Sequence, residues 1–73
     1  MANNTVVAEV TGTVWKIEAK IGEKIALDDV IMIVESMKME IPVHATEAGE
    51  LTELLTAEGE IVNEGQAVAV ISS

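Results

Sequence analysis

The stretch that decides the fold runs from residue 30 to residue 45 and reads VIMIVESMKMEIPVHA. Two strand-like runs, residues 30–35 and 40–45, flank a short connection that predicts a tight hairpin. Two-residue hairpin turns usually contain Asn or Gly, because their central residues need positive φ. Met37 and Lys38 supply neither residue type. Such a departure from local preference is typical of functional positions, so Lys38 is the first candidate site.

The chain also repeats itself with an offset of 37 residues. The recurring positions are glycines and apolar residues: Ala8 and Ala45, Gly12 and Gly49, Val14 and Leu51, Ile17 and Leu54, Gly22 and Gly59, Ile25 and Val62, Ile31 and Val68, and Ile33 and Val70. This pattern predicts one supersecondary unit used twice, with the halves related by a pseudo-two-fold axis. Because only two copies exist, we expect a duplicated domain spanning residues 1–73 and not a solenoid.

Turn residues divide each half into four short strands, so an all-β fold is expected. The expected strands are 5–8, 13–19, 24–26, 30–36, 40–45, 50–56, 61–63 and 67–72. Residues 30–34 and 67–71 are apolar at every position, as in strands covered on both faces. In each half, the apolar pair after the first glycine is three residues apart, which predicts a β-bulge at equivalent places.

One segment fits two secondary structures. Residues 46–58 place Leu51, Leu54 and Leu55 at helical spacing, and Thr46 or Glu47 could begin a helix. The segment 37 residues earlier, 13–17, is rich in β-forming residues. We therefore favour a strand, because the two copies should share one structure.

Composition excludes several classes of function. The net charge is −9, from 13 acidic and four basic residues, which disfavours nucleic acid and anionic membranes as partners. The chain has no cysteine for a disulfide or a thiolate metal site. Its longest apolar run, residues 30–34, is too short to cross a bilayer, and its first residues lack the features of a secretory signal. We expect a soluble cytoplasmic protein.

The remaining side chains predict neither a catalytic nor a metal site. The carboxylates are scattered without a pairing that argues acid–base chemistry, and His44 is most simply a solvated strand residue. Trp15, the only aromatic residue, is expected to cover an apolar patch from a strand. Asp28 stands where the other half has Gly65, and we expect it in a turn, since Asp tolerates the left-handed conformation.

Residues 35–43, ESMKMEIPV, resemble the attachment motif of biotinyl domains of the biotin carboxyl carrier type. The resemblance covers nearly the whole chain, including the turns at Gly22-Glu23 and Gly59-Glu60. It implies a flattened barrel-sandwich of two four-stranded antiparallel sheets, the barrel-sandwich hybrid fold. The lysine would lie on the hairpin between the fourth and fifth strands, at the junction of the two copies.

The resemblance also implies a function. Lys38 would receive biotin as an amide from a biotin protein ligase, a biotin carboxylase would load carboxylate onto the biotin, and a carboxyltransferase would pass it to an acyl-CoA. The chain would then be a non-catalytic carrier subunit of a multi-component, biotin-dependent acyl-CoA carboxylase. The residues around the lysine would form the surface that the ligase reads: Glu35, Ser36, Met37, Met39 and Glu40.

The sequence departs from the family pattern at several places. Ser36 replaces a common Ala, and Asp28 replaces a Gly in a turn that it is expected to stiffen or distort. No insertion forms a protruding thumb and no Pro/Ala-rich linker precedes the domain, so a compact stand-alone carrier is expected. Two alternatives remain: a lipoyl carrier for a 2-oxo-acid dehydrogenase or glycine-cleavage system, whose lysine usually follows Asp, and an unmodified interaction module with an ordinary exposed hairpin.

Overall fold

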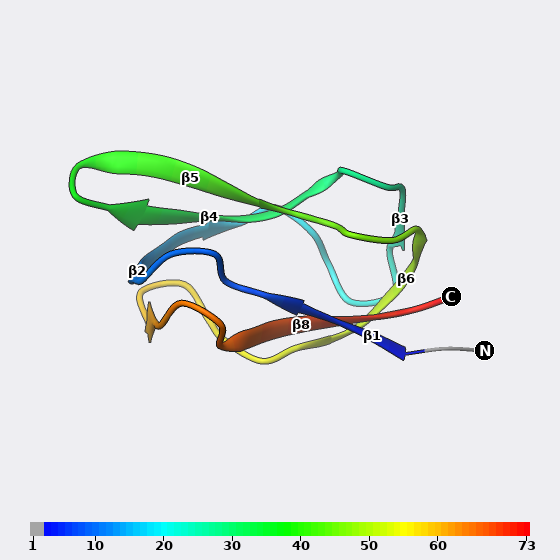
Figure 1. Cartoon of the computed structure of the whole chain (residues 1–73). Coiled ribbons are helices and arrows are strands. Elements are labelled where there is room, and N and C mark those ends of the chain that lie inside the picture. Colours follow the sequence, from blue (N-terminus) through cyan, green and yellow to red (C-terminus); the bar gives the residue numbers. More distant parts are fainter. Residues whose placement is uncertain (1–2) are drawn as a thin grey trace.

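The computed structural model describes residues 3–73, and in this range all regular structure is β. The strands are β1 (Asn3–Val7), β2 (Gly12–Ile17), β3 (Lys24–Ile25), β4 (Val30–Ser36), β5 (Met39–His44), β6 (Gly49–Leu54), β7 (Ile61–Val62) and β8 (Ala67–Ser72). They form two four-stranded antiparallel sheets (Figure 1). We name them the hairpin sheet, with strand order β5-β4-β2-β7, and the terminal sheet, with order β1-β8-β6-β3. The predicted fold class is confirmed.

The duplication is visible in the hydrogen bonds, which recur 37 residues apart. Gly22 N donates to Leu51 O at 2.7 Å, and Gly59 N donates to Val14 O at 2.8 Å. Each bond joins one half of the chain to the other, so neither half can complete its own sheet. The interlocking explains why the repeat is a single folded unit and not two stacked ones.

The turn at Asp28 is not distorted, which corrects the expectation drawn from its missing glycine. Asp28 has a φ of 71° and Gly65 a φ of 84°, so both lie in the left-handed region. Asp28 N donates to Ala45 O at 2.9 Å, and Gly65 N donates to Ala8 O at 2.8 Å. The two turns are therefore equivalent, because aspartate tolerates this conformation better than most residues with a side chain.

Both predicted β-bulges are present. The β2–β4 register runs from Val14↔Val34 directly to Lys16↔Ile33, which leaves Trp15 as the extra residue. The β6–β8 register has the same irregularity one repeat later, where Thr52 is the extra residue. Such bulges increase local twist, and here they help two short sheets wrap around a single core.

The strand interpretation of residues 46–58 is confirmed over β6, and the helical alternative is wrong. Leu51 is fully buried and pairs with Ile71 of β8. This cross-strand pairing is that of a strand, and a helix would not form it. The strand ends at Leu54, earlier than expected, and β2 likewise ends at Ile17 instead of 19. In both halves the chain leaves the sheet soon after its bulge.

The core lies between the sheets and consists of aliphatic side chains and one methionine. Its largest fully buried members are Ile31, Met32, Leu51, Ile71, Val6, Val14, Val34, Val62 and Val68. The expectation that every position of residues 30–34 is covered fails at Val30, which is 36% exposed. The β4–β5 register shifts between Val30 and Met32, and the fully buried positions of β4 begin at Ile31, within this irregularity.

Candidate functional site

The β4–β5 hairpin extends beyond the rest of the hairpin sheet (Figure 1, green, left). Its register is the expected one, with Glu35 opposite Glu40 and Ser36 opposite Met39. Met37 and Lys38 are therefore the two turn residues. The start of β1 and the end of β8 lie at the other end of the molecule, away from the hairpin tip (Figure 1).

The turn holds two ordinary L-residues in a conformation that they rarely adopt. Met37 has a φ of 51° and Lys38 a φ of 66°, as hairpin turns of the primed type require. Left-handed backbone costs a residue with a Cβ about 1–2 kcal/mol. Asn-Gly would form this turn with less strain. The sequence therefore keeps Met-Lys here at a cost in stability, which indicates a function for these side chains.

The hairpin tip presents a free amine between two exposed thioether side chains. Lys38 is exposed, Met37 is 93% exposed and Met39 is 64% exposed. Within residues 3–73 the ion pair found is that of Lys16 with Glu18, at 3.4 Å, and Lys38 makes neither an ion pair nor a hydrogen bond there. An amine so placed is open to acylation by a second protein.

Two carboxylates lie at the base of the turn. Glu35 and Glu40 face each other across the hairpin, and both are exposed. Opposed like charges destabilise a hairpin slightly. All six residues singled out from the sequence thus come together at one tip, with Lys38 at its apex.

Ser36 has a contact that the sequence did not predict. Its Oγ donates a hydrogen bond to the backbone carbonyl of Thr11 at 2.9 Å, and the Thr11 Oγ1 accepts one from Glu64 N at 3.0 Å. Thr11 therefore ties the base of the hairpin to the loops before β2 and before β8. The residue 37 positions after Thr11 is Ala48, which has no hydroxyl, so the bond that Thr11 Oγ1 accepts from Glu64 N has no side-chain counterpart at that position. No local pattern marks such a long-range contact.

Replacing Ser36 with alanine is expected to lower the free energy of unfolding by about 1 kcal/mol, because the Thr11 carbonyl loses its donor. Urea unfolding measures the change. Ser72→Ala is the matched control, since Ser72 also ends a strand and is half-buried, and its hydroxyl makes no hydrogen bond within residues 3–73. Equal destabilisation by the two substitutions would show that the tie does not stabilise the fold.

The other candidate positions are placed away from the tip. His44 is an exposed residue at the far end of β5, as expected. Residues 3–73 contain no group of three or more His, Cys, Asp or Glu side chains arranged to hold a metal ion. No helix in the described part of the chain is long and apolar enough to span a membrane.

Comparison with known proteins gives consistent matches. The family model described as biotin-requiring enzyme matches residues 2–71. The biotin/lipoyl attachment protein of Bacillus subtilis is 39% identical over 69 residues, which are 94% of each chain. The biotin carboxyl carrier protein of Streptococcus mutans is 32% identical over 71 residues, 97% of this chain and 55% of that protein. The crystal structure of Kluyveromyces lactis urea carboxylase matches with a TM-score of 0.93 and 35% identity, covering 99% of this chain and 6% of that chain.

Proposed function

Because the chain belongs to the biotin-requiring enzyme family, we propose that it is a biotin carrier in which Lys38 is the attachment residue. The observation that carries the proposal is the free Lys38 amine at the apex of a strained two-residue turn. A carrier needs a projecting acceptor and a rigid support, and both are present. The chain itself is then a carrier and not a catalyst.

The hairpin fits covalent attachment of biotin. The deprotonated Nζ of Lys38 attacks the acyl carbon of biotinyl-adenylate held by a biotin protein ligase, AMP leaves, and an amide forms. The turn keeps Nζ clear of the sheet surface, and the exposed Met37 and Met39 offer adaptable apolar contacts to the ligase. Glu35, Ser36 and Glu40 complete the surface that we propose the ligase reads.

The fold then acts as a tether. Once bound, biotin supplies a ureido nitrogen that carries carboxylate between two active sites. The paired strands of the hairpin hold Lys38 at a fixed place, so the attached group reaches each partner at a high effective concentration. We propose that the partners are a biotin carboxylase and a carboxyltransferase in the cytoplasm, where ATP is available, and that the acceptor is an acyl-CoA.

Mapping the attached group tests this proposal without any substitution. The protein is co-expressed with a biotin protein ligase, and its intact mass and peptide map are measured. The expected result is one biotinyl group on Lys38 and none on the exposed Lys16, Lys20 or Lys24. These three lysines are internal controls, because they share the amine but lie outside the hairpin turn.

Other masses would overturn the assignment. The relative from Bacillus subtilis is named as an attachment protein for biotin or lipoyl, so a lipoyl carrier is the second candidate. A lipoyl increment on Lys38 in protein from the native host would establish that function instead. An unmodified Lys38 in a host that contains active ligase would favour an interaction module.

A further inference from the structure

Trp15, which the sequence predicts to cover an apolar patch from a strand, lies on β2 and leaves much of its side chain in solvent. It is the extra residue of the β2 bulge, so it has no cross-strand partner on β4. Its side chain is 51% exposed. The indole N–H has no hydrogen-bond partner within residues 3–73. A large aromatic side chain in this state is costly to leave in water and is a typical anchor in protein interfaces.

The duplication provides an internal control for this position. The residue 37 positions later, Thr52, occupies the same bulge in β6. Its Oγ1 donates to Val70 O at 3.2 Å, so the side chain folds back onto its own sheet. The bulge therefore forms without tryptophan, and Trp15 is not explained by the needs of the fold.

A second exposed apolar residue lies on β7, the strand that pairs with β2. Ile61 of β7 pairs with Thr13 of β2, two residues from Trp15, and is 71% exposed. The residue 37 positions before Ile61 is Lys24, so the other half again has a polar residue at this place. We call Trp15 and Ile61 together the β2–β7 patch.

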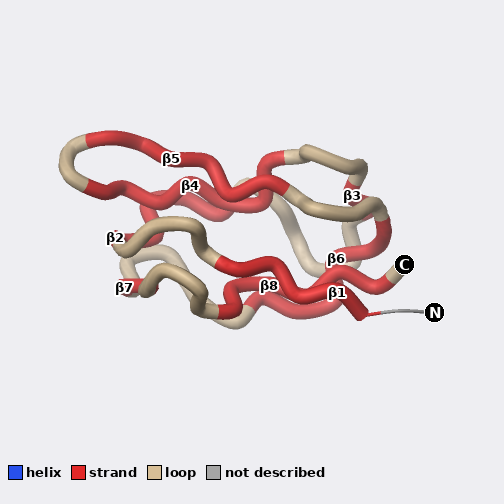
Figure 2. Tube along the Cα trace, in the orientation of Figure 1, coloured by secondary structure: helices blue, strands red, loops and turns tan. Residues whose placement is uncertain are grey.

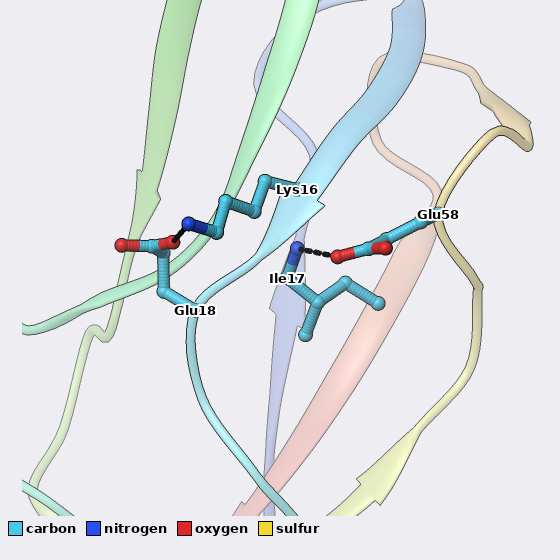
Figure 3. Close-up of polar contacts among 4 residues, drawn as sticks. All are labelled: Lys16, Ile17, Glu18 and Glu58. Atoms are coloured by element: carbon cyan, nitrogen blue, oxygen red, sulfur yellow. Dashed lines mark hydrogen bonds and ion pairs between the residues drawn. The ribbon is translucent and has the colours of Figure 1, made fainter.

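The surroundings of the β2–β7 patch are acidic. The Glu58 carboxylate accepts a hydrogen bond from Ile17 N at 2.9 Å, which fixes it against β2 (Figure 3). On the other side, Glu35 of β4 faces Thr13. Lys16, the cation next to Trp15, is paired with Glu18 at 3.4 Å and is drawn away from Glu58 in Figure 3. The patch is thus an apolar centre with an acidic rim.

The patch and the lysine hairpin share one sheet and one end of the molecule. β2 is the direct neighbour of β4, and β7 and the start of β2 lie at the hairpin end (Figure 2). Val14, which directly precedes Trp15, pairs with Val34 of β4. Val34 is two residues from Ser36, which is about 7 Å along the strand. A protein that receives the group carried by Lys38 would therefore meet the patch at the same time.

We propose that the β2–β7 patch docks the carrier onto the biotin carboxylase. The complementary surface on that enzyme would be an apolar recess bordered by lysine or arginine side chains. This inference rests on the proposed function, because it takes a biotin carboxylase as the partner. The carboxylase binds bicarbonate and ATP, both anions, so a positive potential around its entrance is expected to attract the acidic rim. A second copy of this chain is disfavoured as the occupant, because two chains of net charge −9 repel each other.

Direct binding tests the proposal without relying on attached biotin. All proteins carry Lys38→Arg, so no biotin is attached, and the only tryptophan is replaced by 5-fluorotryptophan to give one ¹⁹F signal from residue 15. Biotin carboxylase from the native host is the titrant, and calorimetry gives the Kd. We expect the ¹⁹F signal to shift on binding, and Trp15→Thr to weaken binding by roughly tenfold or more. Raising the salt concentration should weaken the binding of the unsubstituted patch, since exposed charges are screened.

The substitution copies the residue that the other half already uses at this bulge, so the fold should persist, and circular dichroism checks it. Ile21→Thr is the matched control, since Ile21 is 62% exposed and lies outside the patch. It should leave the Kd within about twofold, as interface-distant surface residues do. An unmoved ¹⁹F signal at saturating carboxylase, an unchanged Kd for Trp15→Thr, or no binding at all would overturn the proposal.

A separate arm tests the ligase as the occupant. With Lys38 restored, Trp15→Thr should be labelled by biotin protein ligase at the rate of the unsubstituted protein. A tenfold loss in that rate would assign the patch to the ligase and overturn its assignment to the carboxylase. Failure of the proposed function has a different signature, which is the absence of a biotinyl group on Lys38 in the unsubstituted protein.

Discussion

Replacing Lys38 with glycine is expected to abolish biotin attachment completely and to stabilise the fold by about 1 kcal/mol relative to alanine at the same position. Lys38 has a φ of 66°, where a Cβ costs about 1–2 kcal/mol and glycine costs little. The larger entropy that glycine loses on folding, about 0.5 kcal/mol or more, offsets part of the gain. Because the acceptor amine is removed, no amide can form on this residue.

Lys38→Ala is the matched control, because it also removes the amine and its charge but keeps the Cβ in the left-handed turn. In thermal unfolding, glycine should raise Tm by roughly 4–8 °C over alanine, as about 1 kcal/mol does in a domain of this size. Lys38→Arg retains a cation near Glu35 and Glu40 and should also remain unlabelled. Labelling of Lys38→Arg would disprove the assigned site, and equal Tm values for glycine and alanine would show that the turn is unstrained.

Gly49→Ala is expected to destabilise the fold by about 3 kcal/mol, which is the upper end for an overpacked core position. A Cβ at Gly49 would lie inside van der Waals contact of the Ser72 carbonyl oxygen and the Ile71 Cγ2. The carbonyl belongs to backbone that is hydrogen-bonded within the terminal sheet, so it cannot move aside easily. This loss is large, because the free energy of unfolding of a chain of this length is typically about 4–11 kcal/mol in total.

Gly59→Ala is the control that separates close approach from backbone conformation. Gly59 has a φ of 90°, but nothing lies within 4 Å of an added Cβ. Only the conformational cost of about 1–2 kcal/mol then applies. Chemical denaturation should therefore rank Gly49→Ala as the more destabilising substitution. The reverse order would mean that β6 and β8 can move apart at Gly49 without loss of stability.

Gly12→Ala offers an independent check, because the first half of the chain contains the equivalent contact. A Cβ added at Gly12 would meet the Glu35 carbonyl oxygen and Val34. The sequence showed that Gly12 and Gly49 recur, but not why. Neither residue has a positive φ, so turn chemistry does not explain them. Their reason is the close approach of the neighbouring strand, β4 at Gly12 and β8 at Gly49, which only the assembled sheets create.

The sequence alone determined the all-β class, the division of each half into four strands and the hairpin register. These follow from local alternation and turn residues, which are properties of near neighbours in the chain, and from the 37-residue repeat, which can be read from the sequence directly. Lys38 was found in the same way, since Met37 and Lys38 occupy a turn that usually favours Asn-Gly.

Only the tertiary structure decided which surfaces the two halves leave exposed. The bulges at Trp15 and Thr52 are equivalent in sequence position, yet the indole is exposed and the hydroxyl bonds to Val70. The tie from Ser36 to Thr11 likewise joins residues that no local pattern connects. The physical reason is that hydrogen bonds and packing between the halves depend on which side chains come into contact in the two folded sheets. Separation along the chain does not predict those contacts.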